Sequence, residues 1–372
     1  MTGEEQGNPV HEALEAPLDK PTGRIVRWGI VGTGQIARQF AADLQRIPEA
    51  RIVSIYSRSV EKAEQFRSEF DAERAYSDFE AFISDSALDV VYIATPNSQH
   101  LPQTLRALRS SKPILTEKPI ALSAPEAQVI EREARRHKTF AMEGLWTRFL
   151  PAIQAARQKI ENGEIGTVKR ITSDLSYYHP YDPQSRFFNR PLGGGAALDL
   201  GVYPVSLAMH LLGQPEQVSG RWIAAPSGVD MRTEITLHYP GVTAQLSCGF
   251  DKDGDNHFLI EGSKGALRID APFLKAQRLT LFAPSVMRSP WVGPDIRMSG
   301  YIGKILNRLP VPGRRIELYP FDGGGLQFEA KAVTDAILNG ERHSPIMPLS
   351  ESISVLRAIG IVLSRPPVTS FS

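Results

Sequence analysis

The sequence predicts an α/β protein with an N-terminal doubly wound parallel sheet and a C-terminal α+β domain that contains a large, mostly antiparallel open sheet. Two observations predict this organisation. Between residues 24 and 147, short runs rich in Val and Ile alternate with helical patterns, as in strands covered on both faces. Beyond that point the runs alternate polar with apolar residues, which is typical of a sheet with one free face.

The length of the chain, 372 residues, exceeds one ordinary core and suggests two or three domains. We expect a flexible tail at 1–23, a dinucleotide-binding domain at 24–147 and a substrate-binding and oligomerisation domain at 148–372. A hydrophobic content of 42% and a charged content of 22% are ordinary for globular proteins. The formal charge of +1 gives no field that attracts nucleic acid or an anionic membrane, so neither is expected as a partner.

In the N-terminal domain the apolar runs predict strands, and the segments between them predict helices. The expected strands are 25–31, 50–56, 90–94, 114–116 and 139–143. The expected helices are 35–45, 59–69 and 102–110.

In the C-terminal domain a helix at 151–162 precedes a strand at 168–178, and a Pro- and aromatic-rich loop leads to an apolar helix at 197–212. Further strands are expected at 217–223, 231–239, 242–250, 257–262 and 266–270. The stretch 283–320 has no clear pattern and is interpreted as a long excursion. Helices at 326–339 and 349–364 close the chain, the second with Ser350 as its capping residue.

Several classes of protein are excluded at this stage. The acidic first 23 residues lack the pattern of a secretory signal, and no apolar run approaches the roughly 18 residues of a membrane span, so a cytoplasmic protein is expected. The single cysteine, Cys248, excludes an intramolecular disulfide and is expected to be buried and inert. Asp251, Asp253 and Asp255 resemble a calcium loop, but Gly262 stands where a glutamate is required, and no metal is expected.

A glycine turn follows the first predicted strand and opens a helix: Gly32-Thr33-Gly34-Gln35-Ile36-Ala37. Gly32 can take the positive φ of the tight turn, and Gly34 lets backbone N–H groups approach a pyrophosphate. Ala37 is small enough for close packing of helix on strand. The free N–H groups and partial positive charge of the helix start suit phosphates. With its strand and helix in place, the motif predicts a Rossmann dinucleotide site formed by Gly32, Thr33, Gly34, Gln35 and Ile36.

The end of the second strand distinguishes the two nicotinamide dinucleotides. A ribose 2′-hydroxyl requires a carboxylate about 20 residues beyond the glycines, but this chain has Ser57 and Arg58. A guanidinium can pair with a 2′-phosphate, which an acid would repel. We therefore favour NADP(H), with NAD(H) possible; the alternative for Arg58 is a solvated residue at a helix start.

Two more strands end in polar residues at the same sheet edge, where open α/β sheets bind ligands. The first ends in Thr95, Pro96 and Asn97, followed by His100, although Asn97 and His100 could instead cap the next helix. The second ends in Glu117, Lys118 and Pro119. A lysine there can donate to a substrate oxygen beside the nicotinamide and lower the pKa of a neighbouring proton donor.

The order of these motifs, from the glycine turn through Ala94-Thr95-Pro96-Asn97 to Glu117-Lys118-Pro119, resembles the glucose–fructose oxidoreductase/inositol dehydrogenase/rhizopine catabolism (Gfo/Idh/MocA) family. The resemblance extends from about residue 26 to 363. It implies an NAD(P)-dependent oxidoreductase acting on sugars, cyclitols or related polyols, with Lys118 catalytic. It also implies a homodimer or homotetramer formed through the C-terminal sheet.

The segment from Gly193 to Pro204 is similar to the family's glycine run and catalytic helix. Asp199 and Tyr203 are four apart, so both are expected on one helical face, which by resemblance meets the nicotinamide. A tyrosine at this position is similar to the branch with glucose–fructose oxidoreductase, dimeric dihydrodiol dehydrogenase and D-xylose dehydrogenase. A phenol with a pKa of about 10 needs a nearby cation to act near neutral pH, and Lys118 is the candidate. The alternatives are that Asp199 only complements the helix dipole in the first turn and that Tyr203 is an aromatic residue of the core.

Other positions are candidates by placement. Trp146 and Arg148 match a segment that lies near the cofactor in relatives, with an ion pair at the domain junction as the alternative for Arg148. Tyr178, Arg186 and Asn189 precede the glycine run and are candidate substrate contacts.

The predicted activity is hydride transfer between NADP(H) and a secondary alcohol, lactol or ketone of a sugar or polyol, with Tyr203 as the acid, Lys118 polarising the oxygen and Asp199 orienting. Two alternatives stay open. The substrate could be a trans-dihydrodiol, or the chain could be a non-catalytic NADP(H)-binding regulator, since fold does not determine function.

Overall fold

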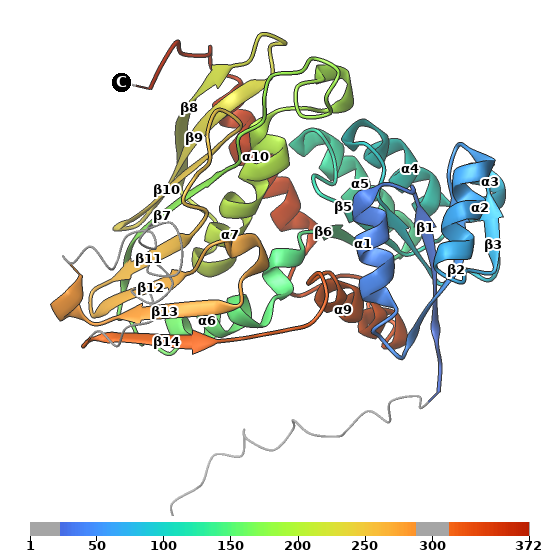
Figure 1. Cartoon of the computed structure of the whole chain (residues 1–372), viewed down its shortest axis with the longest axis horizontal. Coiled ribbons are helices and arrows are strands. Elements are labelled where there is room, and N and C mark those ends of the chain that lie inside the picture. The colour runs from blue at the N-terminus through green and yellow to red at the C-terminus, as the bar shows by residue number, and fades with distance from the viewer. Residues whose placement is uncertain (1–22, 288–311, 372) are drawn as a thin grey trace, which may run out of the picture.

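The computed structural model describes residues 23–287 and 312–371 and contains two sheets (Figure 1). The N-terminal sheet is parallel throughout, with the strand order β3-β2-β1-β4-β5-β6. This is the doubly wound order in which the carboxyl ends of β1 and β4 flank a ligand crevice. Its strands are β1 (Val26–Val31), β2 (Ala50–Tyr56), β3 (Arg74–Tyr76), β4 (Val90–Ile93), β5 (Ile114–Glu117) and β6 (Ala141–Gly144).

Helices on both faces bury this sheet, which is why its strands are apolar without alternation. They are α1 (Gln35–Leu44), α2 (Val60–Glu69), α3 (Phe79–Ile83), α4 (Asn97–Arg109) and α5 (Ala124–His137). Local caps explain several of their starts: Ser59 accepts from the N–H of Lys62, Asp78 from that of Glu80, and Ser123 from that of Glu126.

The C-terminal sheet has the order β14-β13-β12-β11-β7-β10-β9-β8 and is antiparallel except where β7 pairs with β10. Its strands are β7 (Val168–Ser176), β8 (Gln217–Ala224), β9 (Asp230–Tyr239), β10 (Val242–Gly249), β11 (Phe258–Gly262), β12 (Gly265–Ile269), β13 (Arg278–Phe282) and β14 (Arg314–Leu318). The predicted fold class is therefore confirmed in both halves.

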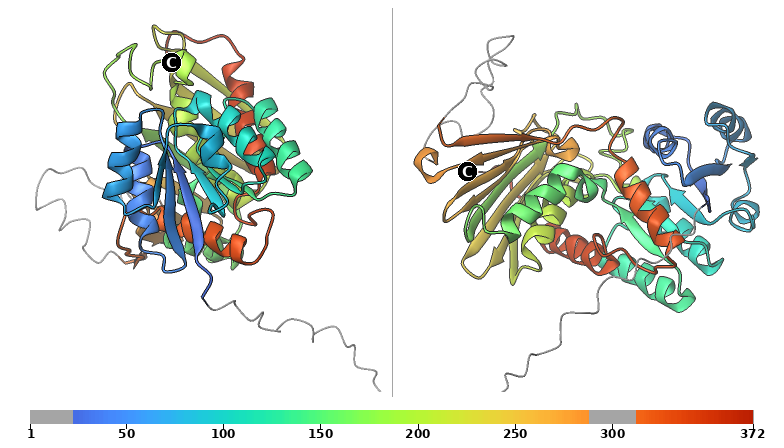
Figure 2. Two further views of the ribbon diagram at one scale, coloured as in Figure 1. Left: turned by 90° about the vertical axis from the view of Figure 1, so that its right-hand side faces the viewer. Right: turned by 90° about the horizontal axis from the view of Figure 1, so that it is seen from below.

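Three helices cover the face of this sheet that is turned toward the N-terminal domain: α6 (Pro151–Glu161), α7 (Val202–Leu212) and α10 (Leu349–Leu363) (Figure 2). Among the described residues, no α-helix covers the opposite face. A short 3₁₀ turn, η1 (Trp146–Phe149), joins the two domains.

Helix α9 (Gln327–Leu338) lies far along the chain but packs against α1 and β1 of the first domain (Figure 1). The carboxylate of Asp43 on α1 accepts hydrogen bonds from the N–H groups of Gly324 (2.7 Å) and Leu326 (2.9 Å), which fixes the segment leading into α9. One face of the dinucleotide-binding domain is thus completed by residues from the C-terminal part of the chain.

The structure corrects several expectations about local elements. Helix α10 begins after Pro348, and Ser350 lies inside it without capping it. The part of 283–320 that the structure describes contains the strand β14, while 288–311 and the predicted tail at 1–22 lie outside the described residues. Elements β3, α3, α5 and β13 are further additions to the prediction.

One described stretch, Arg190–Leu212, is long and apolar enough to cross a membrane, with a mean hydropathy of 1.3, contrary to the sequence-based expectation. Its most apolar window is 83% buried inside the protein, as in a core helix. Cys248 is buried beside it, and burial raises the pKa of its thiol well above the ordinary value, as expected of an inert cysteine.

Candidate active site

The glycine turn lies between β1 and α1 in the predicted conformation. Gly32 has a φ of +104°, and a Cβ there would come within 2.6 Å of the carbonyl oxygen of Ala94, so only glycine fits. A Cβ on Gly34 would meet no atom within 4 Å. Gly34 is also the N-cap of α1 and provides no side-chain cap, and Thr33, Gln35 and Ile36 are at least partly exposed. The turn therefore offers open space and free N–H groups to a phosphate.

Ser57 and Arg58 follow β2 and lie at the same edge of the sheet. Arg58 is exposed, and no interaction with the described residues engages its guanidinium. The hydroxyl of Ser57 accepts weakly from the N–H of Ser59 at 3.4 Å, and Ser59 caps α2. Both predicted residues can thus approach a ligand at this strand end.

At the end of β4, Thr95 and Pro96 lead directly into α4, which begins at Asn97, earlier than predicted. Asn97 does not cap this helix: its side-chain N–H donates to the carbonyl of Gly193 at 3.0 Å and so ties the two domains together. His100 is buried, with Nδ1 2.7 Å from the oxygen of Pro119 and Nε2 2.8 Å from that of Thr95. His100 therefore braces the loops at the ends of β4 and β5.

Glu117 is the last residue of β5, and Lys118 follows it. Glu117 is buried and accepts from the hydroxyl of Tyr92 at 2.5 Å; burial raises the pKa of its carboxyl. Lys118 extends into the second domain, where its Nζ donates to both the backbone oxygen (2.6 Å) and the Oδ1 (3.0 Å) of Asp199. Burial opposes the charge on Lys118, but Asp199 and Tyr203 raise its pKa above the ordinary value, so the amine stays an ammonium.

Asp199 is shared by two cations. Besides Lys118, the guanidinium of Arg186 donates to Oδ1 of Asp199 at 3.1 Å. Burial opposes ionisation of Asp199, but Lys118 and Arg186 lower its pKa below the ordinary range, so it is a carboxylate. Arg186 is 59% exposed and stacks over Phe187, which places it at the solvent side of the cluster. Arg186, which was predicted as a substrate contact, therefore lies beside Asp199 and Lys118.

Tyr203 completes the cluster. The ammonium of Lys118 lies 5.0 Å from the centre of its ring, and the indole N–H of Trp146 donates to its hydroxyl oxygen at 3.3 Å. Burial raises the pKa of Tyr203 to about 12, although Lys118 acts to lower it. Lys118 thus lowers the pKa of Tyr203 as expected, but desolvation, which was not foreseen, raises it by more. At neutral pH the phenol carries its proton and is suited to donate it.

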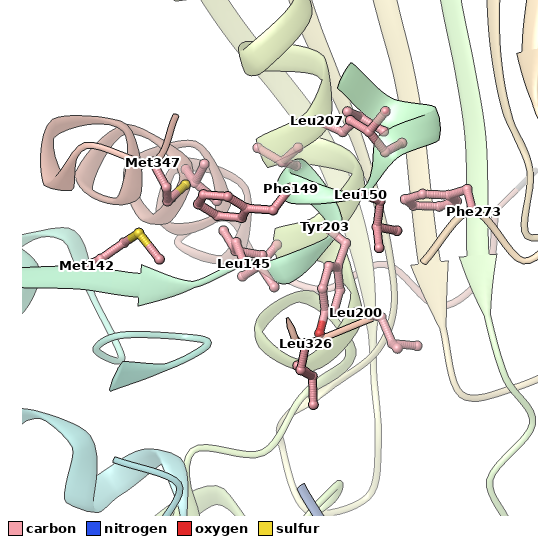
Figure 3. Close-up of a cluster of buried hydrophobic side chains, with 14 of the residues drawn as sticks. Met142, Leu145, Phe149, Leu150, Leu200, Tyr203, Leu207, Phe273, Leu326 and Met347 are labelled. Atoms are coloured by element: carbon pink, nitrogen blue, oxygen red, sulfur yellow. The ribbon is translucent and has the colours of Figure 1, made fainter. Parts of the chain in front are cut away.

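The ring of Tyr203 extends from α7 into the hydrophobic cluster between the domains, beside Leu200 and Leu326 (Figure 3). Only 7% of the residue is exposed. This packing fixes the ring and accounts for the desolvation of its hydroxyl.

The predicted α-helical spacing of Asp199 and Tyr203 is not what brings them together. Residues Ala197–Gly201 form a π-turn ahead of α7, so Asp199 lies in the wider turn and Tyr203 in the regular helix. Both nonetheless contact Lys118.

Arg148 lies in η1 but is directed into the junction of the domains, with its side chain only 1% exposed. Its guanidinium donates to the hydroxyl and carbonyl of Ser206, to the carbonyl of Ile346 and to Glu351. These partners occupy the donors that a cofactor would need, so the structure has the ion pair that was the alternative interpretation.

Two candidate substrate residues have other contacts. The side chain of Asn189 accepts from the N–H of Leu192 and caps a short turn. Tyr178 is 60% exposed, and its backbone N–H donates to Asp253.

Two buried acids near the site were not predicted. Glu329 on α9 is fully buried, and neither of its oxygens has a hydrogen-bond partner. Asp230 is 4% exposed and accepts from the N–H of Ala197 at 2.7 Å, at the start of the π-turn. Glu329 lies inside an apolar helix pattern, and Asp230 lies at the start of a strand. Neither local sequence indicates that the carboxyl is buried.

Comparison with known proteins shows which family this chain belongs to. Residues 26–145 match the Gfo/Idh/MocA oxidoreductase family, NAD-binding Rossmann fold, and residues 153–268 match the C-terminal domain of the same family. The chain belongs to the Gfo/Idh/MocA family. It is thus an NAD(P)-binding oxidoreductase, as the resemblance implied, and an enzyme rather than a regulator.

Curated relatives match along nearly the whole chain. Trans-1,2-dihydrobenzene-1,2-diol dehydrogenase of Mus musculus is 30% identical over 88% of this chain and 92% of its own length. The Homo sapiens enzyme of the same name is 30% identical over 91% of this chain and 98% of its own.

Solved structures of other proteins share the fold. Aldose-aldose oxidoreductase from Caulobacter crescentus, complexed with glycerol, superposes with a TM-score of 0.77 at 23% identity and covers 91% of this chain and 96% of its own. A 3-ketoreductase from Actinomadura kijaniata, in complex with NADP, gives a TM-score of 0.75 at 23% identity over 92% of this chain and 98% of its own.

Proposed function

We propose that this protein is an NADP(H)-dependent oxidoreductase that interconverts a secondary alcohol or lactol of a sugar or polyol with the corresponding carbonyl compound. The observation that carries this proposal is the cluster of Lys118, Asp199 and Tyr203 at the carboxyl edge of the parallel sheet. An ammonium held by a carboxylate beside a protonated phenol is suited to acid–base catalysis at a carbonyl.

The residues present fit the dinucleotide. The open space at Gly34 and the uncapped start of α1 suit the pyrophosphate. The exposed guanidinium of Arg58 and the hydroxyl of Ser57 suit a 2′-phosphate. No acid lies between β2 and the start of α2, which favours NADP(H) over NAD(H). The NADP complex of the 3-ketoreductase is consistent with this choice.

A nicotinamide dinucleotide held by the glycine turn and Arg58 would supply or accept the hydride at the substrate carbon. In reduction, Tyr203 donates its proton to the substrate oxygen as the C=O π bond breaks. Lys118 and the indole N–H of Trp146 then stabilise the phenolate until solvent returns a proton. Asp199 keeps Lys118 charged and holds its ammonium beside the ring of Tyr203. In oxidation the same groups act in reverse.

A trans-dihydrodiol is the second candidate substrate. The identity to the mammalian dihydrodiol dehydrogenases favours it. An aromatic stack near the site does so as well, because the ring of His179 lies on Phe187 at 4.0 Å and against Phe250 at 5.3 Å. Aromatic surface favours an apolar ring, whereas the charges of Arg186 and Asp199 favour a polar one.

A spectrophotometric assay with NADPH and NADH tests the activity on aldoses, cyclitols, anhydro-ketoses and trans-dihydrodiols. We expect turnover with NADPH in at least one class. Lys118→Ala should reduce kcat by about 10²–10⁴-fold and leave NADPH affinity unchanged. Lys264→Ala, which changes an exposed lysine in the turn between β11 and β12, is the control. Loss of NADPH binding in Lys118→Ala would show that this lysine serves the cofactor site instead.

The free face of the C-terminal sheet is the proposed interface of a homodimer or homotetramer. Gln245 is exposed on β10, in the inner part of this sheet. Sedimentation should give a dimer or tetramer, and Gln245→Lys should weaken it, because a charge would be buried in the interface. A monomeric wild type would contradict this part of the proposal.

A further inference from the structure

The catalytic segment is interrupted by a change of helical register. At the π-turn Ala197–Gly201, the N–H of Val202 donates to the carbonyl of Ala197, five residues back instead of four. Such turns are rare and usually lie at functional sites. Asp199, which holds the ammonium of Lys118, is the middle residue of this one.

Pro204 gives a physical reason for the turn. Inside an α-helix, a proline ring clashes with the carbonyl four residues earlier, here that of Leu200, which lies in the π-turn. The wider turn relieves this clash. Pro204 also has no N–H to donate to the Leu200 carbonyl, so nothing at this position favours the tighter α-helical spacing.

Lys118 donates a hydrogen bond to the backbone carbonyl of Asp199. Its Nζ lies 2.6 Å from the backbone oxygen of Asp199, closer than the 3.0 Å to Oδ1. The side chain of Lys118 is only 14% exposed, so an acceptor in place of water matters to its charge. Asp199 thus supplies two acceptors to one ammonium.

The start and the end of the π-turn are held by residues of the C-terminal sheet. The carboxylate of Asp230 accepts from the N–H of Ala197 at 2.7 Å. A Cβ on Gly201 would come within 3.0 Å of the sulfur of Cys248, which leaves no room to shift the turn toward β10. The register is therefore set on both sides of Asp199.

We propose that Pro204 is a positioning residue for Lys118: by widening the helix at Asp199, it turns the Asp199 carbonyl toward the ammonium. This inference rests on the catalytic role of Lys118 in the proposed function. It assigns to Pro204 no contact with substrate or cofactor and no part in holding the fold together.

Pro204→Ala removes the ring that widens the helix and so tests the inference. We expect kcat about tenfold lower, with NADPH affinity unchanged. The alkaline limb of the pH profile for reduction should move to lower pH, because a buried ammonium that loses an acceptor has a lower pKa. The Tm should not fall, since alanine favours a helix interior over proline. A crystal structure should show Nζ of Lys118 beyond about 3.5 Å from the Asp199 oxygen.

Pro102→Ala is the matched control, because Pro102 also lies inside a helix, α4, but is exposed. It should leave kcat and the pH profile at wild-type values. An unchanged profile and Lys118 contact in Pro204→Ala, with the wild type active and Lys118→Ala inactive, would overturn this inference alone. An active Lys118→Ala would overturn the proposed function as well. Pro204→Gly also removes the ring and must shift the limb equally; failure of both variants to fold would contradict the inference.

Discussion

Tyr203 keeps its proton at neutral pH because its hydroxyl is desolvated, and this determines how the two directions of the reaction depend on pH. With a pKa of about 12, the phenol is a ready donor for reduction and is rarely ionised for oxidation. Reduction should be level through the neutral range. Oxidation, which needs the phenolate as base, should gain as the pH rises toward that value.

We predict that kcat/KM for oxidation rises up to tenfold per pH unit in the alkaline range, measured with saturating NADP⁺. Tyr203→Phe removes the titrating group and should abolish this slope and lower kcat by about 10²–10⁴-fold. A Tyr203→Phe enzyme with the wild-type slope would assign the base to another residue.

Arg58 determines cofactor choice if it binds a 2′-phosphate. Arg58→Ala should weaken NADPH by about 10–100-fold, the usual effect of losing a hydrogen bond between charged groups, and NADH by less than about twofold. Fluorescence titration measures both. Arg51→Ala, which changes an exposed arginine on β2 paired with Glu73, is the matched control. Equal losses for the two dinucleotides would remove the argument for NADP(H).

Arg148 shows at the level of elements how the domains are joined. Its buried guanidinium links η1 to α7 and α10, because it donates hydrogen bonds to Ser206 and Glu351. Ser206 lies three residues beyond Tyr203, so this network also fixes the helix that carries the acid.

Arg148→Ala should lower the free energy of unfolding by about 3–5 kcal/mol, because it leaves buried partners unpaired. The NADPH affinity of the folded fraction should stay near that of the wild type. Urea unfolding and fluorescence titration measure the two quantities. Arg157→Ala breaks a surface pair with Glu161 and should cost less than about 1 kcal/mol. A stable Arg148→Ala variant with weak NADPH binding would show that Arg148 serves the cofactor site.

Most elements with local signals could be predicted from the sequence, although α3 and α5, which begin at local caps, were missed. Strands that depend on distant contacts could not be predicted. The strand, glycine turn and helix at Gly32 are contiguous, so their chemistry is local. Strands β13 and β14 pair across a long connection, which periodicity does not reveal. Ser350 has the residue type of a cap, but Pro348, with its fixed φ, already starts the helix.

For the site residues, too, contacts between distant segments could not be predicted from local sequence. Lys118 and Asp199 are 81 residues apart, and only the family resemblance brought them together before the structure did. The net rise in the pKa of Tyr203 and the contacts of Arg148 depend on burial between domains, which no single segment encodes.

Over the whole molecule, the junction between the two halves contains buried acids. Glu329 of α9 is packed near Glu117 and Glu143 of the first domain, and burial together with these two carboxyls raises its pKa well above 4.5. Folding therefore favours its protonated form. This contribution to stability is complete in acid and is lost as the pH rises from the unfolded pKa toward the folded one.

Glu329→Gln keeps the shape of the side chain and cannot ionise. Its unfolding free energy relative to wild type should increase from about pH 5 to about pH 8, by at most about 1.4 kcal/mol per pH unit. Urea unfolding across this range measures the difference. Glu341→Gln, an exposed glutamate just beyond α9, should show no such trend. A difference independent of pH would mean that Glu329 is ionised in the folded protein.

Helix α9 also links the order of synthesis to the order of folding. The first domain emerges from the ribosome with the carboxylate of Asp43 and the adjoining face of α1 still uncovered, because their partners are residues 324–338. The dinucleotide-binding half, although encoded first, is completed only when nearly the whole chain has been made. A fragment ending near residue 147 would carry the nucleotide motif and still lack the helix that seals its core.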